Sequence, residues 1–211
     1  MDLPAAPVLA ALGAMGYALG SVSPGHLIGR RYGRVDLREV GSGSTGATNA
    51  LRTLGVGAGL AVALADIAKG ALAVWLAGLL VGTGEGQAAA ALGAVAGHCW
   101  PIGLRGRGGR GMTPAVGATL LIVPQVAPIA LAAFVGGVAL TRIVSVGSLA
   151  AVSLTVAGYL ALVTLGALRF SAAALALLCG TALIVFVRHA ANIRRLLAGR
   201  EPRLGERPPG L

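Results

Sequence analysis

The segment TPAVGATLLIVPQVAPIALAAFVGGVALT, residues 113–141, decides how many times this chain crosses a membrane. As one straight helix it would extend roughly 43 Å at a rise of about 1.5 Å per residue, which is too long for a single crossing. Pro124 and Pro128 interrupt its middle, and each proline removes a backbone donor. The segment therefore predicts two short, tilted or partly re-entrant helices in place of one long helix.

The rest of the chain has the composition of an integral membrane protein. Of its 211 residues, 56% are hydrophobic and only 11% are charged, and the mean hydropathy is +0.83. This composition excludes an ordinary soluble globular domain, in which about 25% of residues are charged. The first apolar run has no basic region before it, so we expect a retained span rather than a cleaved signal peptide. The apolar runs are residues 8–29, 54–82, 87–103, 113–141, 143–168 and 171–187.

The arginine positions set the predicted topology. Arginines cluster within residues 30–52 and 104–112, at Arg142, and from Arg188 onward. Basic loops tend to face the cytoplasm, so the 113–141 segment is expected to go out and return. This predicts an all-α integral membrane protein with about seven transmembrane helices, the N-terminus outside and the C-terminus cytoplasmic. In this topology 15 of the 17 Lys and Arg residues lie on the cytoplasmic side.

We expect one transmembrane domain over residues 1–211, with 198–211 as a flexible cytoplasmic tail. Glycine pairs four residues apart, such as Gly16 with Gly20 and Gly93 with Gly97, favour close helix packing. The net charge of +10 is explained by anionic lipid headgroups and membrane topology, so no nucleic acid partner is expected. The cysteines and histidines lack disulfide or zinc spacing, and no metal or cofactor is expected. The oligomeric state is open.

The loop LRGRGGRGM, residues 104–112, combines four glycines with three arginines. Glycine lets the backbone approach a ligand closely, and the arginine fork matches the geometry of a phosphate. Backbone N–H groups in such a turn also form anion-binding nests. The loop is therefore interpreted as a phosphate site, and the alternative is a basic loop that only fixes topology.

The segment GSGSTGATNALR, residues 41–52, offers hydroxyl groups, backbone N–H groups and one guanidinium. These groups suit a phosphate monoester. A flexible Gly/Ser linker is the alternative, although Asn49 and Arg52 interrupt a pure linker pattern.

Two further polar clusters lie on the same predicted face. Ser145 and Ser148 follow Arg142 at the start of an apolar run, where they either bind a ligand or only cap and bond the helix. His189 and Asn192 share one face of a helix, so one substrate would meet both side chains. The alternative for this last cluster is an amphipathic helix resting on anionic lipid.

Three polar residues in apolar runs have two interpretations each. Asp66 and Lys69 lie three apart, so they form either a structural ion pair or part of the lining of a polar cavity. His98 is expected at the membrane interface together with Trp100, with a ligand role as the alternative.

In order and spacing these motifs resemble the bacterial acyl-phosphate:glycerol-3-phosphate acyltransferases of the PlsY type. The resemblance runs from Gly20 to Leu197. It implies transfer of a fatty acyl group from acyl phosphate to the sn-1 hydroxyl of glycerol 3-phosphate, which gives lysophosphatidic acid and phosphate. It also implies a seven-helix fold in the bacterial inner membrane, in contact with membrane lipid, with the active site on the cytoplasmic face.

The resemblance also implies roles for individual residues. Those expected to hold glycerol 3-phosphate are Ser42, Arg52, Arg110, His189 and Asn192. Of these, all but Arg110 are expected to be catalytic. Those expected to hold the acyl-phosphate head are Gly108, Gly109, Gly111 and Ser145 or Ser148. The proton acceptor is open between His189 and a substrate phosphate.

The sequence departs from the family pattern at three places. These departures leave a divergent paralogue with altered activity as an alternative. Arg110 stands where the family usually has Lys, Ser44 where it typically has Asn, and Met112-Thr113-Pro114 where it has Val-Ala-Thr. A small anion or lipid-phosphate transporter and a non-catalytic assembly protein are the competing functional classes. None of the three histidines is followed five residues later by Asp, so the His-x4-Asp dyad of acyl-CoA-dependent acyltransferases is absent.

Overall fold

The structure is a computed structural model that describes residues 5–206, and these residues form helices and loops without a strand. The all-α prediction is therefore confirmed for the described part. In chain order the elements are α1 (Ala6–Ser21), α2 (Pro24–Ile28), η1 (Gly29–Gly33), α3 (Ala47–Leu54), α4 (Val56–Leu80), α5 (Gly84–Cys99), η2 (Ile102–Leu104), α6 (Met112–Ile122), η3 (Pro124–Val126), α7 (Ala127–Thr141), α8 (Val144–Thr164), α9 (Ala172–Arg188) and α10 (Ala190–Leu197).

Four helical stretches between residues 5 and 206 are long and apolar enough to cross a membrane. They are Ala6–Gly33, Val56–Leu80, Pro124–Thr141 and Val144–Thr164. A fifth is present if α9 and α10, which meet at 61°, form one bent span. The predicted number of seven is larger because it also counts α5 and α6, which have 16 and 11 residues.

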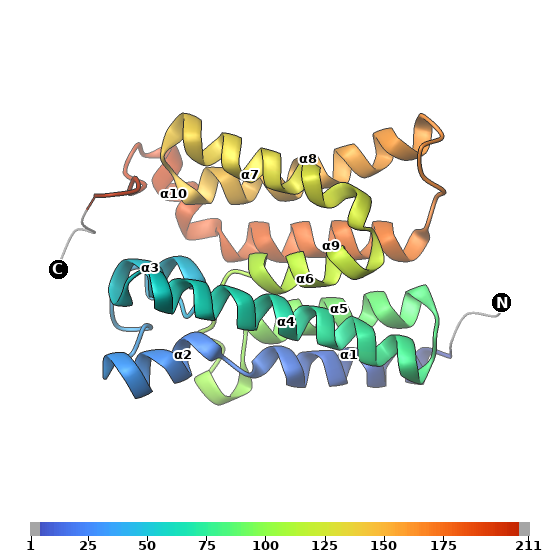
Figure 1. Ribbon diagram of the computed structural model, residues 1–211, viewed down its shortest axis with the longest axis horizontal. Coiled ribbons are helices and arrows are strands. Elements are labelled where there is room, and N and C mark those ends of the chain that lie inside the picture. The colour runs from blue at the N-terminus through green and yellow to red at the C-terminus, as the bar shows by residue number, and fades with distance from the viewer. Residues whose placement is uncertain (1–4, 207–211) are drawn as a thin grey trace.

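The predicted break within 113–141 is confirmed. Helix α6 ends at Ile122, and Val123 leaves the helical conformation with φ −148° and ψ 66°. Pro124 then begins η3, where its missing N–H requires no helical acceptor. Figure 1 shows that the chain reverses here, because α6 and α7 run in opposite directions.

The helices form two groups that α9 joins. Helices α1, α4, α5 and α6 form one group and α7 with α8 the other, while α9 packs against α5, α6 and α8 (Figure 1). Helices α1 and α5 approach closely because a Cβ on Gly16 would lie 1.9 Å from the Ala90 carbonyl oxygen. A Cβ on Gly97 would lie 2.2 Å from the Tyr17 carbonyl oxygen. The predicted glycine contacts therefore fix the distance between these helices.

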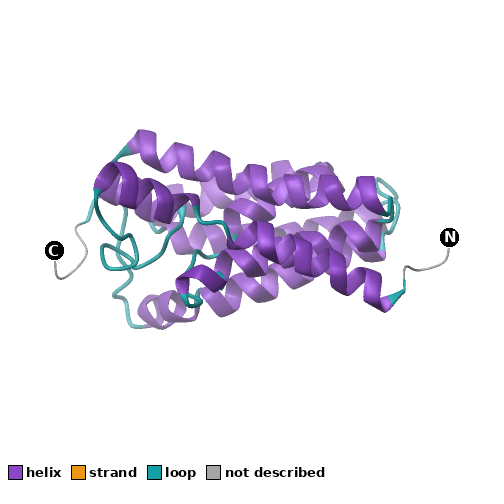
Figure 2. Ribbon diagram, turned by 90° about the horizontal axis from the view of Figure 1, so that it is seen from below, coloured by secondary structure: helices purple, strands orange, loops and turns teal. Residues whose placement is uncertain are grey.

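The short helices α2, α3 and α10 lie at one end of the bundle (Figure 1), and loops gather at the same end (Figure 2). Helix α1 begins at the opposite end, as Figure 1 shows. The segments between η1 and α3, between α5 and α6, and after α10 all meet at the loop-rich end. The polar clusters of the sequence therefore come together in space.

Candidate active site

A cavity of about 340 Å³ lies at the loop-rich end of the bundle. It brings together segments that lie far apart in the chain, from Gly41 to Pro202. The predicted site residues that line it are Ser42, Arg52, Arg110, Ser145, Ser148, His189 and Asn192. The predicted residues Gly108, Gly109 and Gly111 are not among the described residues that line it.

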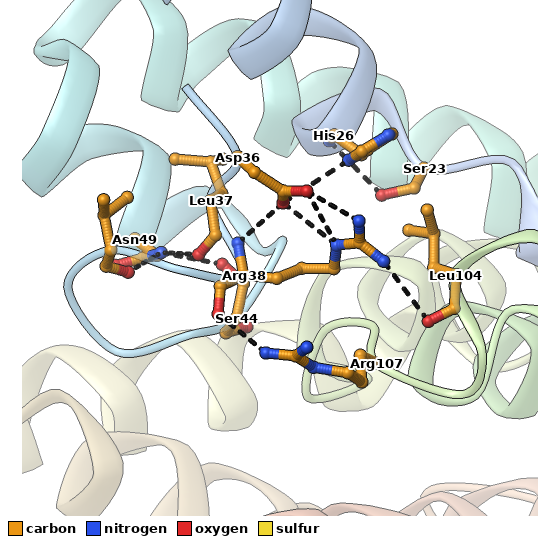
Figure 3. Close-up of polar contacts among 10 residues, drawn as sticks. Ser23, His26, Asp36, Leu37, Arg38, Ser44, Asn49, Leu104 and Arg107 are labelled. Atoms are coloured by element: carbon orange, nitrogen blue, oxygen red, sulfur yellow. Dashed lines mark hydrogen bonds and ion pairs between the residues drawn. The ribbon is translucent and has the colours of Figure 1, made fainter.

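The Ser/Gly loop, residues 41–46, leads into α3. Asn49 of α3 is 1% exposed and holds this loop in one conformation. The Asn49 Nδ2 donates to the carbonyls of Leu37 and Ser44, each at 2.9 Å (Figure 3). Its Oδ1 accepts from the Ser42 N–H at 2.9 Å. This geometry excludes the flexible-linker interpretation, because the buried amide fixes the backbone that presents Ser42.

Arg38 forms an ion pair with Asp36 and connects this part of the chain to residues 104–112, the Gly/Arg loop, as Figure 3 shows. The buried Asp36 carboxylate accepts from Arg38 Nε at 2.9 Å and from Arg38 Nη2 at 2.6 Å. Arg38 Nη1 reaches the Leu104 carbonyl at 3.5 Å, and Arg107 Nη2 donates to the Arg38 carbonyl at 3.0 Å. Hydrogen bonds from Arg38 hold the pKa of Asp36 well below its usual range, although burial opposes this shift.

The Gly/Arg loop packs tightly on the end of α5. The Gly109 N–H donates to the His98 carbonyl at 3.0 Å. A Cβ on Gly108 would lie 2.1 Å from that carbonyl oxygen, and a Cβ on Gly109 would lie 1.9 Å from His98 Nε2. These two glycines are therefore required for packing against His98, and the Gly109 N–H is already engaged.

A buried ionic cluster lies behind the loop. Lys69 Nζ is 2.8 Å from Asp66 Oδ1 and 3.0 Å from His98 Nδ1. Asp66 and Lys69 are not among the described residues that line the cavity, which favours the structural ion pair over the alternative that they line a polar cavity. His98 is 5% exposed, so its ring is enclosed by other residues of the protein. It lines the cavity and supports the loop.

Arg110 is a half-buried cation in the cavity wall. Among residues 5–206 its guanidinium has no hydrogen-bond acceptor, and only Glu201 contributes an opposing negative charge. Burial lowers the pKa of Arg110 to about 10, Glu201 partly opposes this shift, and Arg195 and Arg52 add to it. The guanidinium is therefore charged at neutral pH and is available to an anionic ligand.

His189 lies at the junction of α9 and α10 and is 1% exposed. Its Nδ1 lies 2.8 Å from the Val185 carbonyl oxygen, which only accepts hydrogen bonds. We therefore assign the proton to Nδ1, so that the neutral ring leaves Nε2 as an acceptor. A substrate hydroxyl is the matching donor.

Glu201 is the one carboxylate among the described residues that line the cavity. It accepts from Ser145 Oγ at 2.8 Å, from Arg195 Nε at 2.7 Å, and from the Asn192 amide. Burial raises the pKa of Glu201, but these hydrogen bonds outweigh it and lower the pKa below its ordinary value of 4.5. Glu201 lies in the segment from residue 198 onward, for which the sequence predicts a flexible tail. Residues 207–211 of that tail lie outside the described residues.

An apolar groove of about 410 Å³ continues from the cavity. It shares Met112, Thr113 and Phe134 with the cavity, and its walls come from α6, α7, α8 and α9. The two spaces together match an amphiphilic ligand, with a polar head at the cations and a chain between the helices.

Several cavity residues were missed by sequence reasoning. These are Thr48, Arg195, Arg200 and Glu201. The available signal for Glu201 was an acidic residue within an arginine-rich tail. The departures from the family pattern are accommodated locally: Ser44 Oγ accepts from the Gly46 N–H at 3.2 Å, and Thr113 Oγ1 lies 3.4 Å from Asp66 Oδ2.

Comparison with known proteins agrees with this geometry. A family model described as Glycerol-3-phosphate acyltransferase matches residues 10–199. The chain is 44% identical over 195 residues to the glycerol-3-phosphate acyltransferase of Synechococcus sp. (strain CC9902), covering 92% of this chain and 94% of that protein. It is 42% identical over 193 residues to the glycerol-3-phosphate acyltransferase of Halalkalibacterium halodurans, covering 90% and 93% of the two chains.

Two solved structures share the fold. One is the crystal structure of PlsY (YgiH), an integral membrane glycerol 3-phosphate acyltransferase, in the glycerol 3-phosphate form, with a TM-score of 0.83 and 33% identity over 93% of this chain and 96% of that one. The other is a lysophosphatidic acid form of PlsY, with a TM-score of 0.80 and 30% identity over 93% and 95% of the two chains. The resemblance inferred from the motifs is confirmed, and the chain belongs to the glycerol-3-phosphate acyltransferase family.

Proposed function

We propose that this protein transfers a fatty acyl group from acyl phosphate to the sn-1 hydroxyl of glycerol 3-phosphate in phospholipid synthesis. The observation that carries the proposal is the half-buried Arg110, which lacks an acceptor among residues 5–206 and lies in the same cavity as Arg52. A phosphate supplies the missing acceptors. The apolar groove that leaves this cavity accommodates the fatty chain of the donor.

The two substrates divide the cavity between them. Glycerol 3-phosphate is held by Ser42, Arg52, Arg110, His189 and Asn192. The acyl-phosphate head is held by Ser145 or Ser148 together with the backbone of the 108–111 loop. The Gly109 N–H is engaged by the His98 carbonyl, whereas the N–H groups of Gly108, Arg110 and Gly111 have no acceptor within residues 5–206 and are available to the phosphate.

The chemistry is a direct transfer. The sn-1 oxygen forms a bond to the acyl carbon, the bond from that carbon to the phosphate oxygen breaks, and the phosphate leaves. The hydroxyl proton passes to the departing phosphate, so the products are lysophosphatidic acid and hydrogen phosphate. His189 Nε2 accepts the hydrogen bond of the attacking hydroxyl and orients it. Acyl phosphate is already activated, so positioning and charge stabilisation supply the acceleration.

The proposed topology has seven crossings, with the N-terminus outside and the active site on the cytoplasmic face of the bacterial inner membrane. Seven helices of 11 residues or more, α1 and α4 to α9, alternate in direction along the bundle. Most arginines lie in the loops and short helices near the end that carries the cavity, which the positive-inside rule assigns to the cytoplasm. Alkaline phosphatase fused after Leu168 is expected to be active, and after Arg142 inactive; the reverse would contradict this topology.

The activity is tested with purified protein in detergent micelles. Palmitoyl phosphate with glycerol 3-phosphate is expected to yield palmitoyl lysophosphatidic acid, detected by mass spectrometry. Palmitoyl-CoA is expected to replace palmitoyl phosphate poorly, because the chain lacks the His-x4-Asp dyad. Absence of lysophosphatidic acid with either donor would contradict the proposal and favour a transporter.

A further inference from the structure

Arg188, the last residue of α9, forms hydrogen bonds with the backbone of the Gly/Arg loop and does not line the cavity. Its Nε donates to the Gly109 carbonyl at 3.0 Å, and its Nη2 reaches the Gly108 carbonyl at 3.4 Å. The guanidinium also lies over the Trp100 ring, 5.5 Å from the ring centroid. Arg188 is not among the described residues that line the cavity, whereas Arg110 is. Arg188 therefore contacts the backbone of the loop without being part of the described cavity lining.

These contacts determine how one peptide group is turned. In a trans peptide the C=O and the N–H point in opposite directions. The Gly109 carbonyl faces Arg188, so the Arg110 N–H of the same peptide faces away from it. Within residues 5–206, no acceptor binds the N–H groups of Arg110 and Gly111, whereas the Gly109 N–H is bound by His98.

We propose that Arg188 is a positioning residue that turns the peptide between Gly109 and Arg110 so that its N–H faces the acyl-phosphate head. The inference rests on the proposed function and extends it to a residue outside the cavity. Without Arg188, the glycines allow this peptide to rotate, and the donor is lost from the phosphate site. The residue acts through the loop backbone and not by touching substrate.

The geometry requires a guanidinium and not only a positive charge. Nε and Nη2 belong to one planar fork, so both loop carbonyls are bound at once while the flat face stacks on Trp100. A lysine in this place would keep the charge but would not bind both carbonyls in one plane. The Arg188→Lys variant therefore separates the two explanations.

The test compares Arg188→Gln and Arg188→Lys with the parent and with Arg194→Gln, a matched control at an exposed arginine of α10. The KM for palmitoyl phosphate, the KM for glycerol 3-phosphate and kcat are measured separately in detergent. Loss of the two hydrogen bonds in Arg188→Gln is expected to raise the KM for palmitoyl phosphate about tenfold. The KM for glycerol 3-phosphate is expected to change little, because the long Arg110 side chain reaches that substrate from either peptide orientation.

Arg188→Lys is expected to keep most of this KM defect, and Arg194→Gln is expected to match the parent. Full recovery by lysine, equal rises in both KM values, or a loss confined to kcat would overturn the inference. If the Arg188→Gln protein cannot be purified in folded form, the two KM values and kcat of Arg188→Lys test the positioning role instead. A parent protein that makes no lysophosphatidic acid refutes the proposed function, whereas an active parent with unaffected Arg188 variants refutes only the positioning role.

Discussion

The Glu201 carboxylate accepts a hydrogen bond from the Asn192 amide, which connects the chain beyond α10 to the substrate cavity. The same carboxylate binds Ser145 and Arg195, so it fixes side chains from α8 and α10 relative to one another. The orientation of Ser145, proposed to bind the acyl phosphate, and of Asn192, proposed to bind glycerol 3-phosphate, therefore depends on one acidic residue.

Glu201→Gln is expected to lower kcat/KM about tenfold or more, because an uncharged amide loses charge-assisted hydrogen bonds and adds an N–H2 group that faces other donors. Glu206→Gln, an exposed glutamate of the same segment, is the matched control and is expected to stay within about twofold of the parent. Steady-state assays with both substrates varied measure the effect. Equal activity of the two variants would contradict the role of Glu201.

The pH dependence of this contact has a defined sign. Because the pKa of Glu201 is lowered, its stabilisation is fully present above the ordinary value of 4.5 and is lost as pH falls through the lowered pKa. Thermal unfolding of the parent in detergent is expected to lose this contribution only in acid, whereas Glu201→Gln lacks it at every pH. A parent that loses the same contribution between pH 6 and 8 would contradict the assignment.

Gly109→Ala is expected to reduce activity by about a hundredfold or more, because its Cβ would lie 1.9 Å from His98 Nε2 and the loop must move. Gly103→Ala is the matched control in the preceding turn, where no atom lies within 4 Å of an added Cβ. Activity and yield of folded protein are measured together. A fully active Gly109→Ala would show that the loop does not depend on its packing against His98.

His189→Asn is expected to lower kcat/KM about tenfold while the shape of the pH–rate profile is retained, because it removes the Nε2 acceptor for the hydroxyl. His189→Gln, whose amide reaches further, is expected to retain more activity than His189→Asn. Loss of the acidic limb of the profile in His189→Asn would instead make His189 the proton acceptor. That result would contradict proton transfer to the departing phosphate.

Ala130→Trp is expected to obstruct the apolar groove. Turnover of palmitoyl phosphate is expected to fall about tenfold, while turnover of octanoyl phosphate changes little. The indole would fill the part of the groove that the long acyl chain needs and the short chain does not. Ala132→Trp, at an exposed position of the same helix outside the groove, is the matched control. Equal losses for both chain lengths would place the acyl chain elsewhere.

Much of the architecture was predictable because its causes are local. Pro124 and the length of the apolar segment forced a break, and the arginine clusters indicated which loops meet. The position of Glu201 was not predictable, since no local pattern specifies where a segment after the last helix returns. The role of Gly109 was ambiguous for a similar reason: a glycine needed for packing and one needed for ligand approach look identical in a sequence.

The most direct test of the central claim is the amount of phosphate released from palmitoyl phosphate by purified protein, with and without glycerol 3-phosphate. Direct transfer predicts no enzyme-dependent phosphate release without glycerol 3-phosphate, and one lysophosphatidic acid for each phosphate when it is present. A burst of phosphate equal to the amount of protein in the absence of glycerol 3-phosphate, or phosphate release without lysophosphatidic acid, would contradict the account.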